Sequence, residues 1–200
     1  MKDFVNALTI ELLKHPLLWI FLVLSILITI YYKKIRGFMG EFWVRRELNK
    51  LPKDKYIVLN NIMIKSSKGS HQIDHIIISK YGIFVIEMKN FYGLITGDEY
   101  KDKWIQHLGK NKYYFNNPIH QNYGHIKALE ELTQKENDKF ISVICISNQA
   151  KVDVKAKNVT QLDLLSKLIQ SYTAEILNDD LYEIKNKIEH NNILDKELRS

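Results

Sequence analysis

Two carboxylates and one lysine stand close together in the sequence, and these residue types can carry out hydrolysis together. Asp74 lies in residues 72–79 (QIDHIIIS), Glu87 lies in residues 82–88 (GIFVIEM), and Lys89 follows directly. Hard cations such as Mg²⁺ bind one or two carboxylates and keep positions for water and phosphate. A nearby lysine can orient or deprotonate an attacking water and offset charge at phosphorus. These residues therefore predict metal-assisted hydrolysis of a phosphate ester.

The two segments that carry these residues predict an antiparallel hairpin. Both are apolar and rich in β-branched residues, and a turn signal separates them. If the turn centres between Lys80 and Tyr81, paired residue numbers sum to 161, and Asp74 faces Glu87. Glu87 and Lys89 are two residues apart and project from the same face of their strand. We therefore expect all three side chains on one patch of sheet.

An ion pair is the alternative interpretation of the same residues. Lys89 could pair with Glu87 or Asp74 on a solvated face, and such surface pairs are common and nearly neutral in energy. Strands as apolar as these are normally buried on at least one face. Carboxylates placed there are unfavourable unless they pair or bind a cation. The residues alone leave both interpretations open.

Five short motifs follow one another over residues 37–147. They are Gly40-Glu41 with Val44, QIDHI at 72–76, GIFVIEMK at 82–89, Tyr92-Gly93 with Gly97 and Trp104, and NPIHQ at 117–121. In order and spacing they resemble the nuclease-related domain, NERD, a family with the PD-(D/E)xK signature. The resemblance implies an α/β fold, with a restriction-endonuclease-like mixed β-sheet core flanked by helices. It also implies a nuclease that depends on Mg²⁺ or Mn²⁺.

The resemblance assigns a role to each central residue. Asp74 and Glu87 would bind the metal, with the Met88 carbonyl as a further ligand. Lys89 would orient or activate the hydrolytic water.

Two outlying residues take their roles from the resemblance alone. Glu41 would bind the metal indirectly or buttress Lys89, and Gln121 would line the same site from the next helix. Without the resemblance, Glu41 is an ordinary exposed helix carboxylate. Gln121 is then a solvated residue in the first turn after Pro118.

Composition limits the class of protein. The 200 residues are 46% hydrophobic and 26% charged, as in globular proteins. A single cysteine excludes an intramolecular disulfide and a zinc site built from cysteines. The spacing of the histidines fits no common zinc pattern. The net charge of +6 comes from the middle of the chain, since residues 33–110 carry 15 basic and 8 acidic side chains. This excess favours an anionic partner.

Basic and aromatic side chains around the hairpin are candidates for nucleic-acid contact. The residues selected are Lys65, Lys68, Lys101, Lys103 and Trp104. Lysines suit phosphate contact and aromatic rings suit base stacking. DNA is the favoured nucleic acid over RNA. The alternative is a solvated basic face beside an anionic membrane leaflet.

The N-terminal segment predicts a membrane anchor. Residues 15–32 carry no charge, and about 18 helical residues span roughly 27 Å, close to the thickness of a bilayer core. Trp19 and Tyr31 stand near the two ends, where interfacial aromatics belong. A buried core helix and a cleaved signal peptide are the alternatives, but no A-x-A-like site follows. Lysines and arginines after the span place the N-terminus outside and residues 33–200 in the cytoplasm of a bacterial cell, at the inner membrane.

The expected organisation has three parts. Residues 1–36 form the anchor, residues 37–150 the NERD-like domain, and residues 151–200 a C-terminal helical extension. We expect helices over 37–51, 118–133, 162–169 and 181–188, and strands over 56–64, 72–79, 82–88, 92–97, 103–105 and 140–147. The alternative function is a catalytically inactive, membrane-tethered module that binds nucleic acid or assembles with protein partners.

Overall fold

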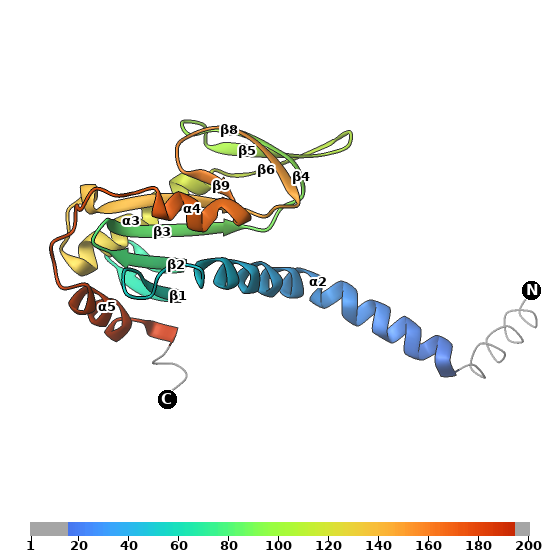
Figure 1. The fold of residues 1–200 in the computed structure, drawn as a ribbon. Coiled ribbons are helices and arrows are strands. Elements are labelled where there is room, and N and C mark those ends of the chain that lie inside the picture. Colours follow the sequence, from blue (N-terminus) through green and yellow to red (C-terminus); the bar gives the residue numbers. More distant parts are fainter. Residues whose placement is uncertain (1–15, 195–200) are drawn as a thin grey trace, which may run out of the picture. The chain divides into compact units, whose positions relative to one another are not determined.

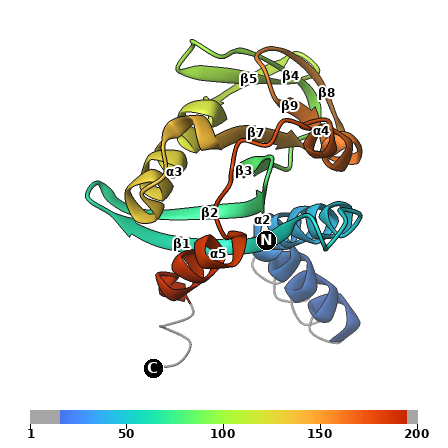
Figure 2. The same ribbon diagram turned by 60° about the vertical axis from the view of Figure 1, so that its left-hand side comes forward.

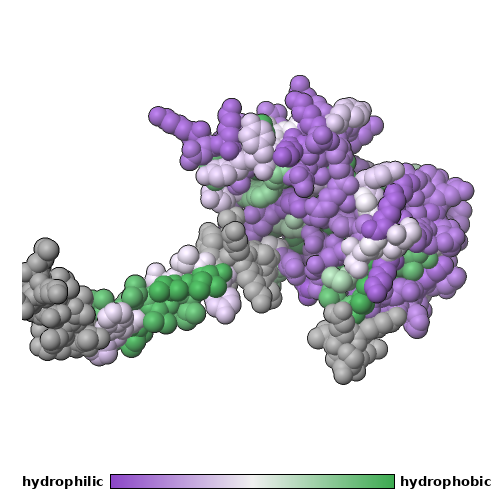
Figure 3. Space-filling view, turned by 180° about the vertical axis from the view of Figure 1, so that it is seen from behind, coloured by the Kyte–Doolittle hydropathy of each residue, from purple (hydrophilic) through white to green (hydrophobic). Residues whose placement is uncertain are grey.

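The computed structural model describes residues 16–194, apart from the side chains of residues 32–38. The chain divides into two compact units, residues 1–39 and 40–200. Helix α2, Pro16–Leu48, begins in the first unit and ends in the second. Its large apolar side chains between residues 17 and 31 are 42–74% exposed, and they form a hydrophobic surface (Figure 3).

The predicted membrane-spanning helix is not supported by the part of the chain that the structure describes. Over residues 16–194, no helix combines the length and the apolar character needed to cross a membrane. Residue 15 and the side chain of residue 32, which belong to the predicted span, lie outside the described part.

A five-stranded sheet forms the centre of the second unit (Figures 1 and 2). Its strands are β1 (Ile57–Ser66), β2 (Gly69–Ser79), β3 (Gly82–Lys89), β7 (Phe140–Ile146) and β9 (Val159–Gln161). The spatial order is β1-β2-β3-β7-β9. The first three strands are antiparallel, whereas β7 runs parallel to β3 and β9 parallel to β7. The sheet is therefore mixed, as expected.

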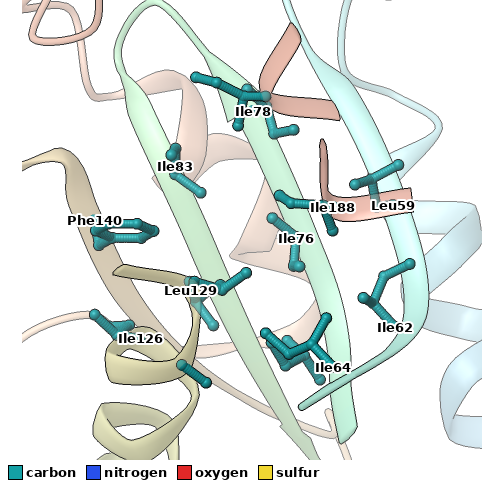
Figure 4. Packing of buried hydrophobic residues seen from close by; sticks show 14 of the residues in the cluster. Leu59, Ile62, Ile64, Ile76, Ile78, Ile83, Ile126, Leu129, Phe140 and Ile188 are labelled. Carbon is teal, nitrogen blue, oxygen red and sulfur yellow. The ribbon is translucent and has the colours of Figure 1, made fainter. Parts of the chain in front are cut away.

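Helices cover both faces of this sheet. Helix α3 (Pro118–Thr133) and helix α5 (Leu181–His190) pack on one face, while α4 (Leu165–Gln170) and the end of α2 pack on the other. Alternation along β2 sends Ile76 to the first face and Ile77 to the second. Figure 4 shows the isoleucine-rich core under α3 and α5. Each fully buried isoleucine contributes roughly 1.5–3 kcal/mol.

A second, four-stranded sheet lies beyond the end of the first, at the top of Figure 1. Its strands are β4 (Gly93–Asp98), β5 (Lys103–Leu108), β6 (Asn111–Asn116) and β8 (Ala150–Lys155), in the order β6-β5-β4-β8. Strand β8 runs parallel to β4, and the other pairs are antiparallel. One face packs through Ile95 and Trp104 against Ile146 of β7. Gly97 is required for this packing, since a Cβ there would lie 2.5 Å from the Trp104 ring.

The sequence predicted the central elements but not the second sheet. The pair His75 and Ile86 confirms the expected register of the hairpin, and α3 has the expected bounds. Strands β6, β8 and β9 were not expected. Residues 150–161, placed mostly in a helical extension, instead add strands to both sheets, and short 3₁₀ turns form at Asn137–Lys139 and Leu162–Leu164.

Candidate active site

The position of Asp74 follows from an irregularity in the pairing of β1 with β2. Ile73 and Ile76 are three residues apart on β2, yet both pack into the same buried cluster, which strict alternation does not allow. Asp74 lies between them, opposite Asn61 of β1, which has φ +52°. Asparagine tolerates this left-handed conformation. The β1–β2 pairing is interrupted at this point, and the Asp74 carboxylate accepts a 2.8 Å hydrogen bond from the Met88 backbone N–H on β3.

The end of β3 and the start of α3 bring three predicted residues together. Lys89 Nζ donates to Glu87 Oε1 at 2.6 Å and to Gln121 Oε1 at 3.0 Å. Glu87 is only 3% exposed, and the Lys89 side chain is 22% exposed. The ammonium group is thus held between a buried carboxylate and the first helical turn of α3.

The electrostatics of the two carboxylates fit a divalent cation. Burial and the neighbouring Glu87 raise the pKa of Asp74 to about 6. Glu87 Oε2 is buried and has no hydrogen-bond partner within the described residues. The raised pKa of Asp74 indicates negative charge that lacks full compensation, and Glu87 Oε2 leaves one carboxylate oxygen available to a ligand. A hard cation bound by Asp74 and Glu87 would supply that compensation.

No larger metal cluster supplements this pair among residues 16–194. Groups of three or more histidine, cysteine, aspartate or glutamate side chains arranged for a metal are absent there. A Mg²⁺ site does not require three such groups, because one or two carboxylates with water and substrate phosphate are enough. The residues present therefore fit Mg²⁺ or Mn²⁺ as the resemblance implies.

His125 of α3 also belongs to the site, and the sequence analysis did not single it out. Its Nε2 lies 3.4 Å from Glu87 Oε2 without forming a hydrogen bond, and its side chain is 8% exposed. Burial on its own raises the pKa of Glu87, but His125 and Lys89 outweigh burial and lower that pKa. The sequence could have indicated His125, because it follows Gln121 by four residues and therefore lies on the same helix face.

Glu41 stands apart from the other predicted site residues. Its side chain is 43% exposed and lies 3.7 Å from Arg45, one turn later on α2. Its negative charge makes a minor contribution to the raised pKa of Asp74. Within the described residues, no hydrogen bond or ion pair joins it to Lys89. Direct buttressing of Lys89 by Glu41 is therefore not seen.

The start of α3 is fixed by Asn117, the N-cap residue. Its Oδ1 accepts a 2.9 Å hydrogen bond from the Ile119 N–H, and the residue is 1% exposed. Its Nδ2 donates to three carbonyls between β4 and β5, those of Asp98, Glu99 and Lys101, at 3.2, 3.1 and 2.7 Å. One side chain therefore joins the second sheet to the helix that carries Gln121 and His125.

The residues predicted to contact nucleic acid do not form one surface. Lys65 and Lys68 are exposed at the turn between β1 and β2, whereas Lys101 and Lys103 are exposed on the second sheet. Trp104 is fully buried beneath that sheet, and its indole N–H donates to the Asp98 carbonyl at 3.0 Å. The expectation that Trp104 stacks on a base is therefore wrong for this structure.

Comparisons with known proteins identify the family to which the chain belongs. The family model described as the nuclease-related domain, NERD, matches residues 36–147, a range that contains every residue of the site. An uncharacterized protein of Bacillus anthracis is 38% identical over 171 residues, covering 82% of this chain and 81% of the relative. No solved structure matches the chain significantly.

Proposed function

Because the chain belongs to the nuclease-related domain family, we propose that it is a metal-dependent nuclease that hydrolyses phosphodiester bonds, in DNA rather than RNA. The observation that carries the proposal is the joined set of Glu87, Lys89 and Gln121 beside Asp74. An ordinary surface ion pair would not need a carboxylate that is 3% exposed, with one oxygen left unpartnered.

Each side chain has a role in this proposal. Asp74 and Glu87 would hold Mg²⁺ or Mn²⁺, which when bound lowers the pKa of water and stabilises charge on the phosphate. Lys89 orients the attacking water and offsets negative charge that develops at phosphorus. Gln121 Oε1 holds the Lys89 ammonium group, and His125 keeps Glu87 in its charged form. Glu41 adds negative charge near Asp74 from outside this set.

The direct test is DNA cleavage by the full chain and two matched variants. Glu87→Gln removes one buried carboxylate charge, and Glu136→Gln removes one exposed charge at a distance from the site. We expect Mg²⁺-dependent cleavage of supercoiled DNA by the parent chain and by Glu136→Gln. The Glu87→Gln variant should lose at least about 100-fold in rate, the scale of an essential electrostatic group.

Two outcomes would count against the nuclease proposal. Cleavage that persists at full rate in Glu87→Gln would contradict the assigned site. No cleavage by the parent chain, with DNA bound equally well in EDTA, would instead support the inactive, tethered binding module. Thermal unfolding of each variant would show whether a loss of activity reflects a loss of fold.

The location of the protein is a separate part of the proposal. We propose that the chain is attached to the bacterial inner membrane through its N-terminal apolar stretch, with the NERD domain in the cytoplasm. The support is the run of exposed apolar side chains between residues 17 and 31 and the basic residues that follow it. An apolar surface of this extent is normally covered by lipid or by protein.

A further inference from the structure

The second sheet has one face that no described helix covers. Pairing and alternation place the exposed residues Lys103, Lys112, Tyr114, Lys151 and Lys155 on this side, and we refer to it as the outer face. Leu94, Asn116 and Asp153 are also exposed there. In Figures 1 and 2 it points away from the first sheet and its helices. The opposite face is the one that packs on β7.

Alternation along the strands confirms that the two faces differ in character. On β8, Val152 and Val154 turn inward into the apolar cluster, while Lys151 and Lys155 on the same strand are exposed. On β5, Trp104 turns inward and Lys103 outward. The lysines therefore belong to one regular surface and are not scattered around the molecule.

The lysines of the outer face are available for an anionic ligand. Among the described residues, none of Lys103, Lys112, Lys151 and Lys155 has a carboxylate within 4.0 Å, although other lysines of the chain do. Two aspartates share the face, and one of them, Asp98, accepts a 2.9 Å hydrogen bond from a backbone N–H. The face therefore carries a net positive charge that is not neutralised within the protein.

A hollow in the outer face gathers part of this charge. It has a volume of about 240 Å³. Its polar lining consists of three lysines, one threonine and two aspartates: Lys101, Lys103, Lys155, Thr96, Asp98 and Asp153. The three ammonium groups outnumber the two carboxylates, and together with the hydroxyl group they can bind a phosphate group. Figure 3 shows a largely hydrophilic surface over this upper part of the molecule.

An aromatic ring stands between the lysines. Tyr114 is 65% exposed, and its cross-strand neighbour on β5 is Ile105, whose own neighbour on β4 is Thr96. Tyr114, Ile105 and Thr96 form a row across the three strands, and Lys103 and Lys112 lie on opposite sides of this row. An exposed tyrosine between cationic groups can stack with a base while the lysines contact the flanking phosphates.

We propose that the outer face binds single-stranded nucleic acid, with phosphates on the lysines and a base stacked on Tyr114. The inference rests on the proposed function, because the bound strand would be substrate or product of the nuclease. A single strand fits better than a duplex, since stacking on an open sheet needs an unpaired base. The outer face holds the strand at a distance from Glu87 and Lys89, which lie on the first sheet.

The test measures binding without cleavage. The full chain is titrated in EDTA with fluorescein-labelled oligothymidylate, and fluorescence anisotropy is followed at several salt concentrations. We compare the parent chain with Lys103→Gln/Lys155→Gln and with a matched control, Lys53→Gln/Lys55→Gln, which removes two exposed charges elsewhere.

We expect the outer-face pair to weaken binding at low salt by about tenfold or more, and the control pair to change it little. The slope of log affinity against log salt should fall by about 1.4, or about 0.7 for each lost phosphate contact to a single strand. Tyr114→Ala should also weaken binding, whereas Tyr114→Phe should preserve it because the ring remains.

Several outcomes would overturn the inference. Equal loss in the two lysine pairs would show non-specific charge, and unchanged binding in Tyr114→Ala would remove the stacking. Equal or tighter binding of a duplex of the same length would contradict the single-strand assignment. Failure of the nuclease proposal is seen separately, as cleavage that Glu87→Gln does not reduce, and it leaves this binding measurement interpretable.

Discussion

At the scale of single residues, Asp74 is a site where function and stability are opposed. Its pKa rises to about 6 in the folded chain because of burial and the neighbouring Glu87, against an ordinary value of 3.8. The folded state therefore binds a proton between these two pH values that the unfolded state has already released. Stability contributed by Asp74 is greatest at low pH and falls as the pH rises through 6.

The prediction for Asp74 concerns stability in the absence of metal. Asp74→Asn keeps an oxygen that can accept the Met88 N–H but carries no charge. We expect it to raise the free energy of unfolding by about 1–3 kcal/mol at pH 8 and by about half as much at pH 5. Urea unfolding at both pH values in EDTA measures this difference, with Asp54→Asn as an exposed control. An equal gain at both pH values would show that the Asp74 charge is not the cause.

The sequence predicted the central residues because their geometry is local. The hairpin register, whose last pair is His75 and Ile86, brings Asp74 next to the end of β3. Two-residue spacing then puts Lys89 on the same face as Glu87. His125 was missed because its contact with Glu87 joins α3 to β3, and no local sequence pattern shows such a tertiary contact. Trp104 was misassigned because its burial depends on Gly97, which leaves space for the indole ring on a strand of a sheet that was not predicted.

At the scale of elements, the start of α3 is the joint that connects the second sheet to the candidate site. Asn117 caps the helix with one side-chain atom and binds three carbonyls with the other. Gln121 lies one turn further along the helix, and its backbone N–H donates to the Asn117 carbonyl at 3.3 Å. A shift of this joint would therefore move the Gln121 oxygen that holds Lys89.

Two substitutions separate the roles of the Asn117 side chain. Asn117→Ala loses the cap and removes one hydrogen-bond donor from each of three carbonyls, of which the Asp98 carbonyl keeps the Trp104 N–H. We therefore expect a loss of about 2–4 kcal/mol in the free energy of unfolding. Asn117→Asp retains the cap acceptor but directs a carboxylate at those carbonyls, so it should be destabilised by at least 1 kcal/mol as well. Urea unfolding measures both variants. Stability equal to the parent in Asn117→Asp would mean that capping alone matters.

Strands β6 and β8 escaped the sequence analysis for different physical reasons. Strand β6 (NKYYFN) is exposed along most of its length, so it lacks the apolar run by which a strand is recognised. Strand β8 (AKVDVK) does alternate, but its partner β4 lies more than 50 residues earlier. Only the tertiary pairing, and not the local pattern, shows that residues 150–155 belong to the second sheet.

At the scale of the whole molecule, residues 148–194 are an integral part of the second unit. Leu177, Ile184 and Ile188 are buried in the same cluster as the inward residues of β1 and β2. Strands β8 and β9 close one edge of each sheet. The family match ends at residue 147, so the described residues that follow are a part of this fold that the match does not cover.

We expect the apolar stretch of residues 17–31 to attach the full chain to the membrane. Charges in the middle of the stretch should weaken it, because an arginine near the bilayer centre is unfavourable by about 2.5–3.5 kcal/mol. We therefore compare the parent chain with Leu24→Arg/Ile26→Arg, at positions that are 52% and 50% exposed. The control is Leu164→Arg/Tyr182→Arg, at exposed apolar positions of the second unit.

The measurement is fractionation of bacterial cells that express each full chain, followed by extraction of the membranes with alkaline carbonate and with detergent. We expect the parent and the control to stay with the membranes in carbonate and to dissolve in detergent, while Leu24→Arg/Ile26→Arg appears largely in the carbonate supernatant. If the parent chain is released by salt alone, electrostatic contact accounts for any attachment and the apolar stretch does not. If the two double variants fractionate alike, the exposed side chains of residues 17–31 do not hold the protein at the membrane, and their partner must be sought among proteins.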